Sequence, residues 1–189
     1  MLYFYSMQID WQKHYFLSNN IWVYGNIILI IPFLIACFNR MKNPDIKTHL
    51  WTDHLARFFL VFTCLYYIYD LPIKYFIDGG ETICQKSFFI HHISSLFIIP
   101  PIIFNDYIPW WANPIGFLHG FCIAFPEFEP LNYIYALALM YFHYGICQKP
   151  FRDLKGYWIT RISINGVWIF AIFLLIGDCS NFLPLAPDS

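Results

Sequence analysis

Long apolar runs separated by short polar segments dominate the chain. A transmembrane helix needs about 20 mainly apolar residues, with a practical lower limit of about 17. Six runs reach or approach this length, and they cover residues 21–38, 55–76, 88–104, 110–125, 132–147 and 159–176. The pattern therefore predicts an all-α fold, a polytopic transmembrane bundle of about six spans.

Proline and polar breaks mark the ends of these runs. Asn43-Pro44 follows the first run, and Pro100-Pro101 interrupts the third, where it should kink or end the helix. The fourth and fifth runs are short, so a single re-entrant hairpin is an alternative to two spans. The distribution of basic residues decides between these alternatives.

Basic residues gather on one side of the membrane if the chain crosses it six times. Eight of the eleven Lys and Arg residues then share that face, namely Arg40, Lys42, Lys47, Arg57, Lys149, Arg152, Lys155 and Arg161. The opposite face receives the acidic loops and tail, with Asp78, Glu81, Glu127, Glu129, Asp178 and Asp188. The positive-inside rule favours six spans and places both termini away from the cytosol, or away from the matrix in a mitochondrial membrane.

The predicted organisation is one transmembrane domain with short flanks. Residues 1–20 are interpreted as an aromatic interfacial segment, residues 21–177 as the six-span domain, and residues 178–189 as a polar tail. The first residues lack the features of a cleaved signal or a transit peptide. We expect an integral membrane protein of the endoplasmic reticulum or the mitochondrial inner membrane.

Composition narrows the possible functions. The chain is 59% hydrophobic and 12% charged, with a net charge of −1, so nucleic acid is excluded as a partner. The motifs GxGxxG, GxxxxGK[ST], HExxH and GxSxG are absent, which argues against nucleotide binding and hydrolysis, and no cofactor is predicted. Cys84 and Cys179 are either a disulfide or two free thiols.

Three ionisable residues at membrane depth are the most informative. Asp70 lies late in the second run, and His91 and His92 lie early in the third. Ionisable groups in spans usually face the bundle interior or a wet cavity. Asp70 either pairs with Lys74 one turn away or orients one of the histidines, and the histidines are either interfacial or interior acid–base groups. Adjacent residues point about 100° apart, which disfavours a shared metal, so no metal site is predicted.

A second set of polar residues follows in the later runs. His119 lies in the fourth run, and Glu127 and Asn132 lie near the junction with the fifth. His119 is either a hydrogen-bonded core residue or a ligand-binding group. Glu127 suits a solvated turn, and Asn132 suits a helix cap after Pro130. All three are also candidates for lipid contact.

Three stretches resemble the TLC-domain family of lipid-handling membrane proteins, which includes the ceramide synthases and non-enzymatic relatives. They are the segments YIYDL at 67–71, FIHHI at 89–93 and PEFEPLN at 126–132. The resemblance implies a TLC-like bundle and lipid binding that involves Asp70, His91, His92, His119, Glu127 and Asn132. The His-Asp-x-x-Asp signature of the ceramide-synthase branch is absent after the histidines, which disfavours that branch.

Three functional hypotheses follow. The first is a lipid-binding or lipid-regulating protein without a complete catalytic signature, whose partners are membrane lipids. The second is an accessory subunit of a large membrane assembly, such as a respiratory complex, with other membrane subunits as partners. The third is an acyltransferase that uses His91 or His92 as a general base oriented by Asp70. The missing signature places the enzyme last.

Overall fold

The computed structural model describes residues 11–46, 48, 50–78, 83–125, 128, 130–148 and 157–175. Within these ranges the fold is entirely helical, as the apolar runs predict. The elements are α1 (Trp11–Lys42), α2 (Trp51–Asp78), α3 (Ile83–Ile103), the 3-10 helix η1 (Trp110–Ala112), α4 (Asn113–Ala124), α5 (Pro130–Ile146) and α6 (Tyr157–Leu175).

Three of these helices are long and apolar enough to cross a membrane. The qualifying stretches are Phe16–Lys42, Trp51–Ile77 and Gln85–Ile103, within α1, α2 and α3. The remaining helices are shorter, and α4 has only 12 residues, which gives it a length of about 18 Å against a hydrocarbon core of about 30 Å. Within the part of the chain that the structure describes, α1, α2 and α3 therefore carry the membrane character predicted from the sequence.

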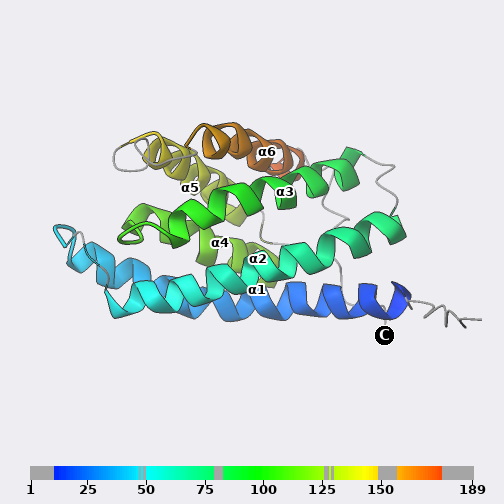
Figure 1. The fold of residues 1–189 in the computed structure, drawn as a ribbon, viewed down its shortest axis with the longest axis horizontal. Coiled ribbons are helices and arrows are strands. Elements are labelled where there is room, and N and C mark those ends of the chain that lie inside the picture. Colours follow the sequence, from blue (N-terminus) through cyan, green and yellow to red (C-terminus); the bar gives the residue numbers. More distant parts are fainter. Residues whose placement is uncertain are drawn as a thin grey trace, which may run out of the picture.

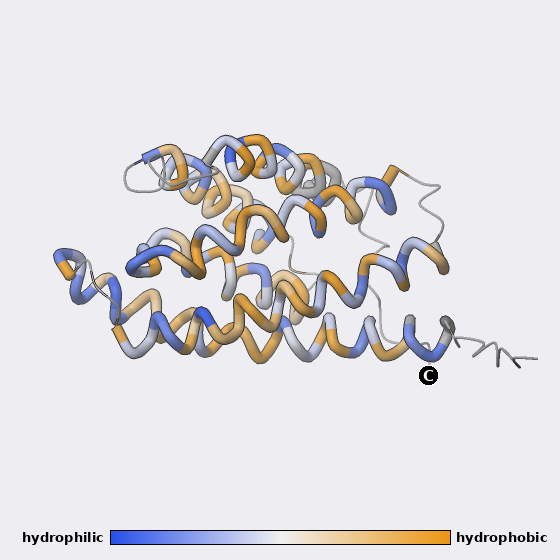
Figure 2. Tube along the Cα trace, in the orientation of Figure 1, coloured by the Kyte–Doolittle hydropathy of each residue, from blue (hydrophilic) through white to orange (hydrophobic). Residues whose placement is uncertain are grey.

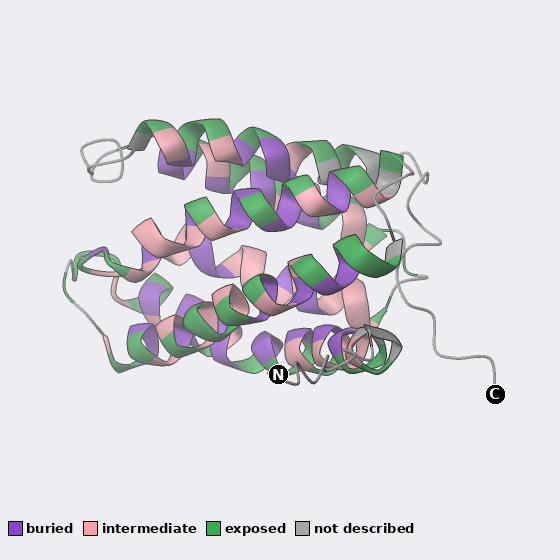
Figure 3. Ribbon diagram, turned by 45° about the vertical axis from the view of Figure 1, so that its right-hand side comes forward, coloured by how far each residue is buried: buried purple, intermediate pink, exposed green. Residues whose placement is uncertain are grey.

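The helices enclose a common interior. In Figure 1, α1 and α2 run side by side in opposite directions, and α3 lies along α2. The second half closes the bundle, because α4 packs against α1, α6 packs against α3, and α5 contacts both α4 and α6. Buried positions lie on the inner side of the helices and exposed positions on the outer side (Figure 3).

The outer surface is apolar along most of the length of the helices. Figure 2 shows hydrophobic segments in the central parts of α1 and α2 and hydrophilic residues at the end where the two helices connect. Exposed side chains include Ile31 on α1, Phe62 on α2 and Leu137 on α5. A contiguous apolar exterior of this kind suits contact with lipid.

A buried ion pair closes the connected end of α1 and α2. The Arg40 guanidinium bonds the Asp53 carboxylate, and it donates to the backbone oxygen of Ile46 at 2.5 Å. Arg57 of α2 donates to the backbone oxygen of Asn105, which follows α3. Part of the predicted basic face is therefore observed at one end, whereas Lys47, Lys149, Arg152 and Lys155 lie outside the described residues.

Two helices extend beyond the runs or breaks that the sequence marks. Helix α1 begins at Trp11, so residues 11–20 are helical and continuous with the first predicted span. Helix α3 runs through Pro100 and Pro101 to Ile103, and the backbone N–H of Phe104 still bonds the oxygen of Pro100 at 3.0 Å. The two prolines remove the bonds that their own N–H groups would donate, and the helix ends two residues after them.

Candidate functional site

Asp70 and His92 meet inside the bundle because they lie at matching depths. Asp70 is about 12 Å before the end of α2 and His92 about 13 Å after the start of α3, at about 1.5 Å of rise per residue. The helices run in opposite directions, so the two side chains come together. The His92 Nδ1 lies 3.2 Å from the Asp70 Oδ2, and Ser18 of α1 donates to the Asp70 Oδ1. We call Ser18, Asp70 and His92 the Asp70 cluster.

Aromatic rings enclose the histidine of this cluster. The Tyr67 ring stacks on the His92 ring with centroids 4.2 Å apart, and the rings of Phe88 and Trp22 lie at 4.0 and 5.6 Å. All three members of the cluster are fully buried. Charges in such an environment need their partners, because water does not replace a lost interaction there.

Lys74 connects α2 to α1 through a hydrogen bond. Its ammonium group donates to the Asn19 Oδ1 at 2.5 Å, whereas Asp70 faces Ser18 and His92. The position of His92 beside Asp70 agrees with the interpretation in which Asp70 orients a histidine. Lys74 ties the end of α2 to α1.

His91 faces a different part of the interior from His92. Neighbouring helical residues point about 100° apart, and the His91 ring stacks against the His119 ring of α4 with centroids 6.2 Å apart. Both histidines are buried. Neither of the two is therefore exposed on the outer surface of the bundle.

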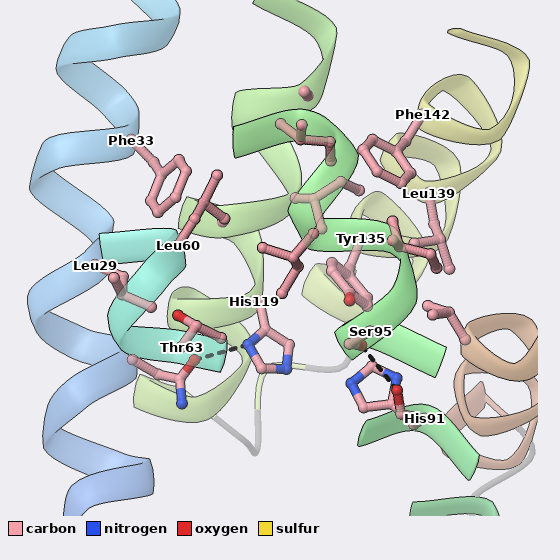
Figure 4. A pocket seen from close by; sticks show the side chains of 18 of the residues that line it. Leu29, Phe33, Leu60, Thr63, His91, Ser95, His119, Tyr135, Leu139 and Phe142 are labelled. Atoms are coloured by element: carbon pink, nitrogen blue, oxygen red, sulfur yellow. Dashed lines mark hydrogen bonds between the residues drawn. The ribbon is translucent and has the colours of Figure 1, made fainter. Parts of the chain in front are cut away.

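His91 and His119 line a central cavity with a volume of about 110 Å³ (Figure 4). From His91 to Ile102 its lining follows α3 over about 16 Å. One end is polar and the other is apolar. The polar end contains Asn26, Thr63, Tyr67, His91, Ser95, His119 and Tyr135, and the apolar end includes Phe33, Ile98, Ile102, Ile108, Leu139, Phe142 and Val167.

Hydrogen bonds fix the groups at the polar end. The His119 Nδ1 lies 2.8 Å from the Asn26 Oδ1, and the Asn26 amide donates to the backbone oxygen of Trp22 at 2.6 Å. Ser95 donates to the backbone oxygen of His91 at 2.8 Å. Figure 4 shows His119 on α4 across from His91 and Ser95 on α3.

Two glycines let α4 approach α1 closely enough to place His119. A Cβ atom on Gly120 would lie 2.5 Å from the backbone oxygen of Asn26, and one on Gly116 would lie 2.6 Å from the Phe33 ring. Both distances are shorter than side chains tolerate. The absence of a side chain at these positions therefore brings His119 within reach of Asn26.

The predicted site residues divide into two groups and some outliers. His91 and His119 line the cavity, whereas Asp70 and His92 contact each other and are not among its lining residues. Asn132 is half-buried in the first turn of α5 and also does not line the cavity. Glu127 lies outside the described residues, as do Cys179 and the side chain of Cys84. Among the residues that are described, no three His, Cys, Asp or Glu side chains could hold a metal ion together.

The contribution of α1 to the site is absent from the residues that the sequence predicts. Ser18, Trp22 and Asn26 are spaced four residues apart and are buried on one face of the helix. Two polar side chains at this helical period in an apolar helix are a detectable signal. Ser18, however, lies before the predicted first span at residues 21–38.

The TLC resemblance remains a prediction. No protein-family model, no curated protein and no solved structure matches this chain.

Proposed function

We propose that this protein is an integral membrane protein of TLC-like, six-span architecture that binds the hydrocarbon chain of a lipid in its central cavity. The observation that supports this proposal most directly is the cavity itself, which has a polar end and a long apolar end inside an apolar bundle. Ligand sites in proteins are typically concave and mostly apolar, with a few placed polar groups.

The size of the cavity limits what it can hold. A volume of about 110 Å³ is comparable to that of an engineered cavity of about 150 Å³ that binds benzene. It therefore suits one slender chain or the end of a longer one, and not a complete two-chain lipid. A single narrow chain matches the lining by isoleucine, leucine and phenylalanine.

The positions of the histidines support only part of the acyltransferase hypothesis. His92 and Asp70 have the relative position of a base and its orienting carboxylate. However, Tyr67 separates His92 from the cavity, so a substrate chain in the cavity would meet His91 and His119 instead.

Filling the cavity tests the proposal. Ile98 lines the cavity and is buried, whereas Ile93 on the same helix is 47% exposed on the outer face. We expect the full-length Ile98→Phe variant to lose chains that co-purify with the wild-type protein, as measured by native mass spectrometry after mild extraction. Ile93→Phe adds the same volume outside the cavity and should retain them. Equal retention by both variants, or a wild-type protein free of lipid, would contradict the proposal.

A further inference from the structure

We infer that the cavity selects a single-chain lipid whose polar end is an uncharged hydroxyl group, which donates its hydrogen bond to the Nε2 of His119. This inference rests on the proposed function and specifies its ligand. Three observations support it: the cavity lining has no formally charged side chain, His119 bonds Asn26 through Nδ1, and aromatic rings separate the Asp70 cluster from the cavity.

The lining carries no formal charge. None of the described residues around the cavity is Asp, Glu, Lys or Arg. A carboxylate or phosphate placed at the polar end would be buried without a basic side chain to pair with it, which is strongly unfavourable. A hydroxyl group needs only one hydrogen-bond partner there.

The bond between His119 and Asn26 defines which ring nitrogen is available. The Asn26 amide nitrogen donates to the backbone oxygen of Trp22, which identifies the other amide atom as the oxygen. That oxygen can only accept, so the His119 Nδ1 must donate to it. No carboxylate lines the cavity to pair with an imidazolium, so the ring is neutral and its Nε2 is an acceptor.

The available nitrogen lies on the cavity side of the ring. The Nδ1 is bonded to Asn26, and Figure 4 shows the second ring nitrogen of His119 on the side of His91. Within the described part of the chain, His119 has Asn26 as its hydrogen-bonding partner, through Nδ1. A ligand hydroxyl at this end would donate to Nε2 while its chain extends along α3 toward Ile102.

Aromatic rings lie between the cavity and the Asp70 cluster. Tyr67 lines the cavity with one side and stacks on His92 with the other. Trp22 likewise contacts the His92 ring at 5.6 Å and the His119 ring at 5.1 Å. Asp70 and His92 therefore stay apart from the ligand, and the polar end recognises it through neutral groups alone.

Three probes of equal chain length test this inference on the full-length protein in micelles. 1-Decanol, its methyl ether and decanoate are compared as competitors of a photoreactive alkyl diazirine that labels the cavity, with peptides identified by mass spectrometry. The ether cannot donate a hydrogen bond to His119. We therefore expect it to compete about tenfold more weakly than the alcohol, which is the factor expected for the loss of one hydrogen bond. Decanoate at neutral pH should compete about a hundredfold more weakly than the alcohol.

The His119→Phe variant should remove the preference. It keeps a ring of similar size but has no acceptor, so the alcohol and the ether should compete equally. Persistence of the preference in this variant, or equal competition by all three probes in the wild type, would overturn the inference but leave chain binding intact. If the alkyl probe does not label the cavity residues at all, the proposed function itself fails.

Discussion

The Asp70 cluster and the central cavity lie on opposite sides of the Tyr67 ring, which forms a wall between them. The two regions differ in the charge and the enclosure of their polar groups. In the cluster, a carboxylate and an imidazole are fully buried and partnered, and aromatic rings enclose the imidazole. In the cavity, neutral polar groups gather at one end of an open volume of about 110 Å³. His91 and His92, adjacent in the sequence, belong to different regions.

The two regions should therefore respond differently to substitutions of their side chains. Removing a partner from the cluster leaves a buried polar group that water does not reach, so the cost falls on stability. Removing a polar group from the cavity leaves room for water or ligand, so the cost falls on binding. The cluster holds α1, α2 and α3 together, and the cavity is the region in which a ligand can act.

The largest expected effect is that of Asp70→Ala. Ser18 and His92 would both lose their partner in an enclosed site, and the free energy of unfolding should fall by about 4 kcal/mol. Unfolding by SDS in mixed micelles measures the change. Asp45→Ala, at an exposed position between α1 and α2, is the control and should change little. Similar values for the two variants would show that the cluster does not hold the helices together.

Tyr67→Ala should remove the wall between the two regions. The lost ring packs on His92 and lines the cavity, so we expect a loss of about 3 kcal/mol. The enlarged cavity should also let an alkyl diazirine label the peptide that contains Asp70. Tyr67→Phe keeps the ring and should keep the wild-type labelling pattern. Unchanged labelling in Tyr67→Ala would mean that the ring does not separate the regions.

Gly120→Ala should disturb the cavity through the backbone. The added Cβ would meet the backbone oxygen of Asn26 at 2.5 Å, which forces α4 away from α1 at a cost of about 2 kcal/mol. Competition by 1-decanol should weaken as well, because His119 moves with α4. Gly25→Ala is the matched control, since nothing lies within 4 Å of its added Cβ, and it should stabilise α1 by about 0.5 kcal/mol. A Gly120→Ala variant as stable as wild type would refute this packing argument.

The sequence predicts the helices better than it predicts the site. Apolar runs mark each of the six α-helices, because burial in lipid or in the bundle requires long apolar segments. The same runs misplace the start of α1, since Lys13 and Asn19 interrupt the apolar pattern although the helix continues through them. Helix continuity depends on backbone bonding, which hydropathy does not report.

The pairing of Asp70 with a histidine was predictable, but the cavity was not. Matching depth in antiparallel helices brings Asp70 toward His92, and depth can be read from residue numbers. Which histidine faces the carboxylate depends on helix rotation, which the sequence leaves open. The role of Asn26 depends on how closely α4 packs at Gly120, a contact between residues far apart in the chain.

The smallest effect is expected for His119→Phe, and its comparison with His92→Phe is the sharpest test of the two regions. Loss of His119 leaves the Asn26 oxygen facing the cavity, where a water molecule has room to replace the donor, so we expect a cost of about 1 kcal/mol. Loss of His92 leaves the Asp70 carboxylate without one partner beside aromatic rings, and the cost should be about 3 kcal/mol. Unfolding in mixed micelles provides both values under one condition. Equal costs for the two substitutions would show that the cavity is as closed as the cluster, and a cavity so closed would have no place for a lipid chain.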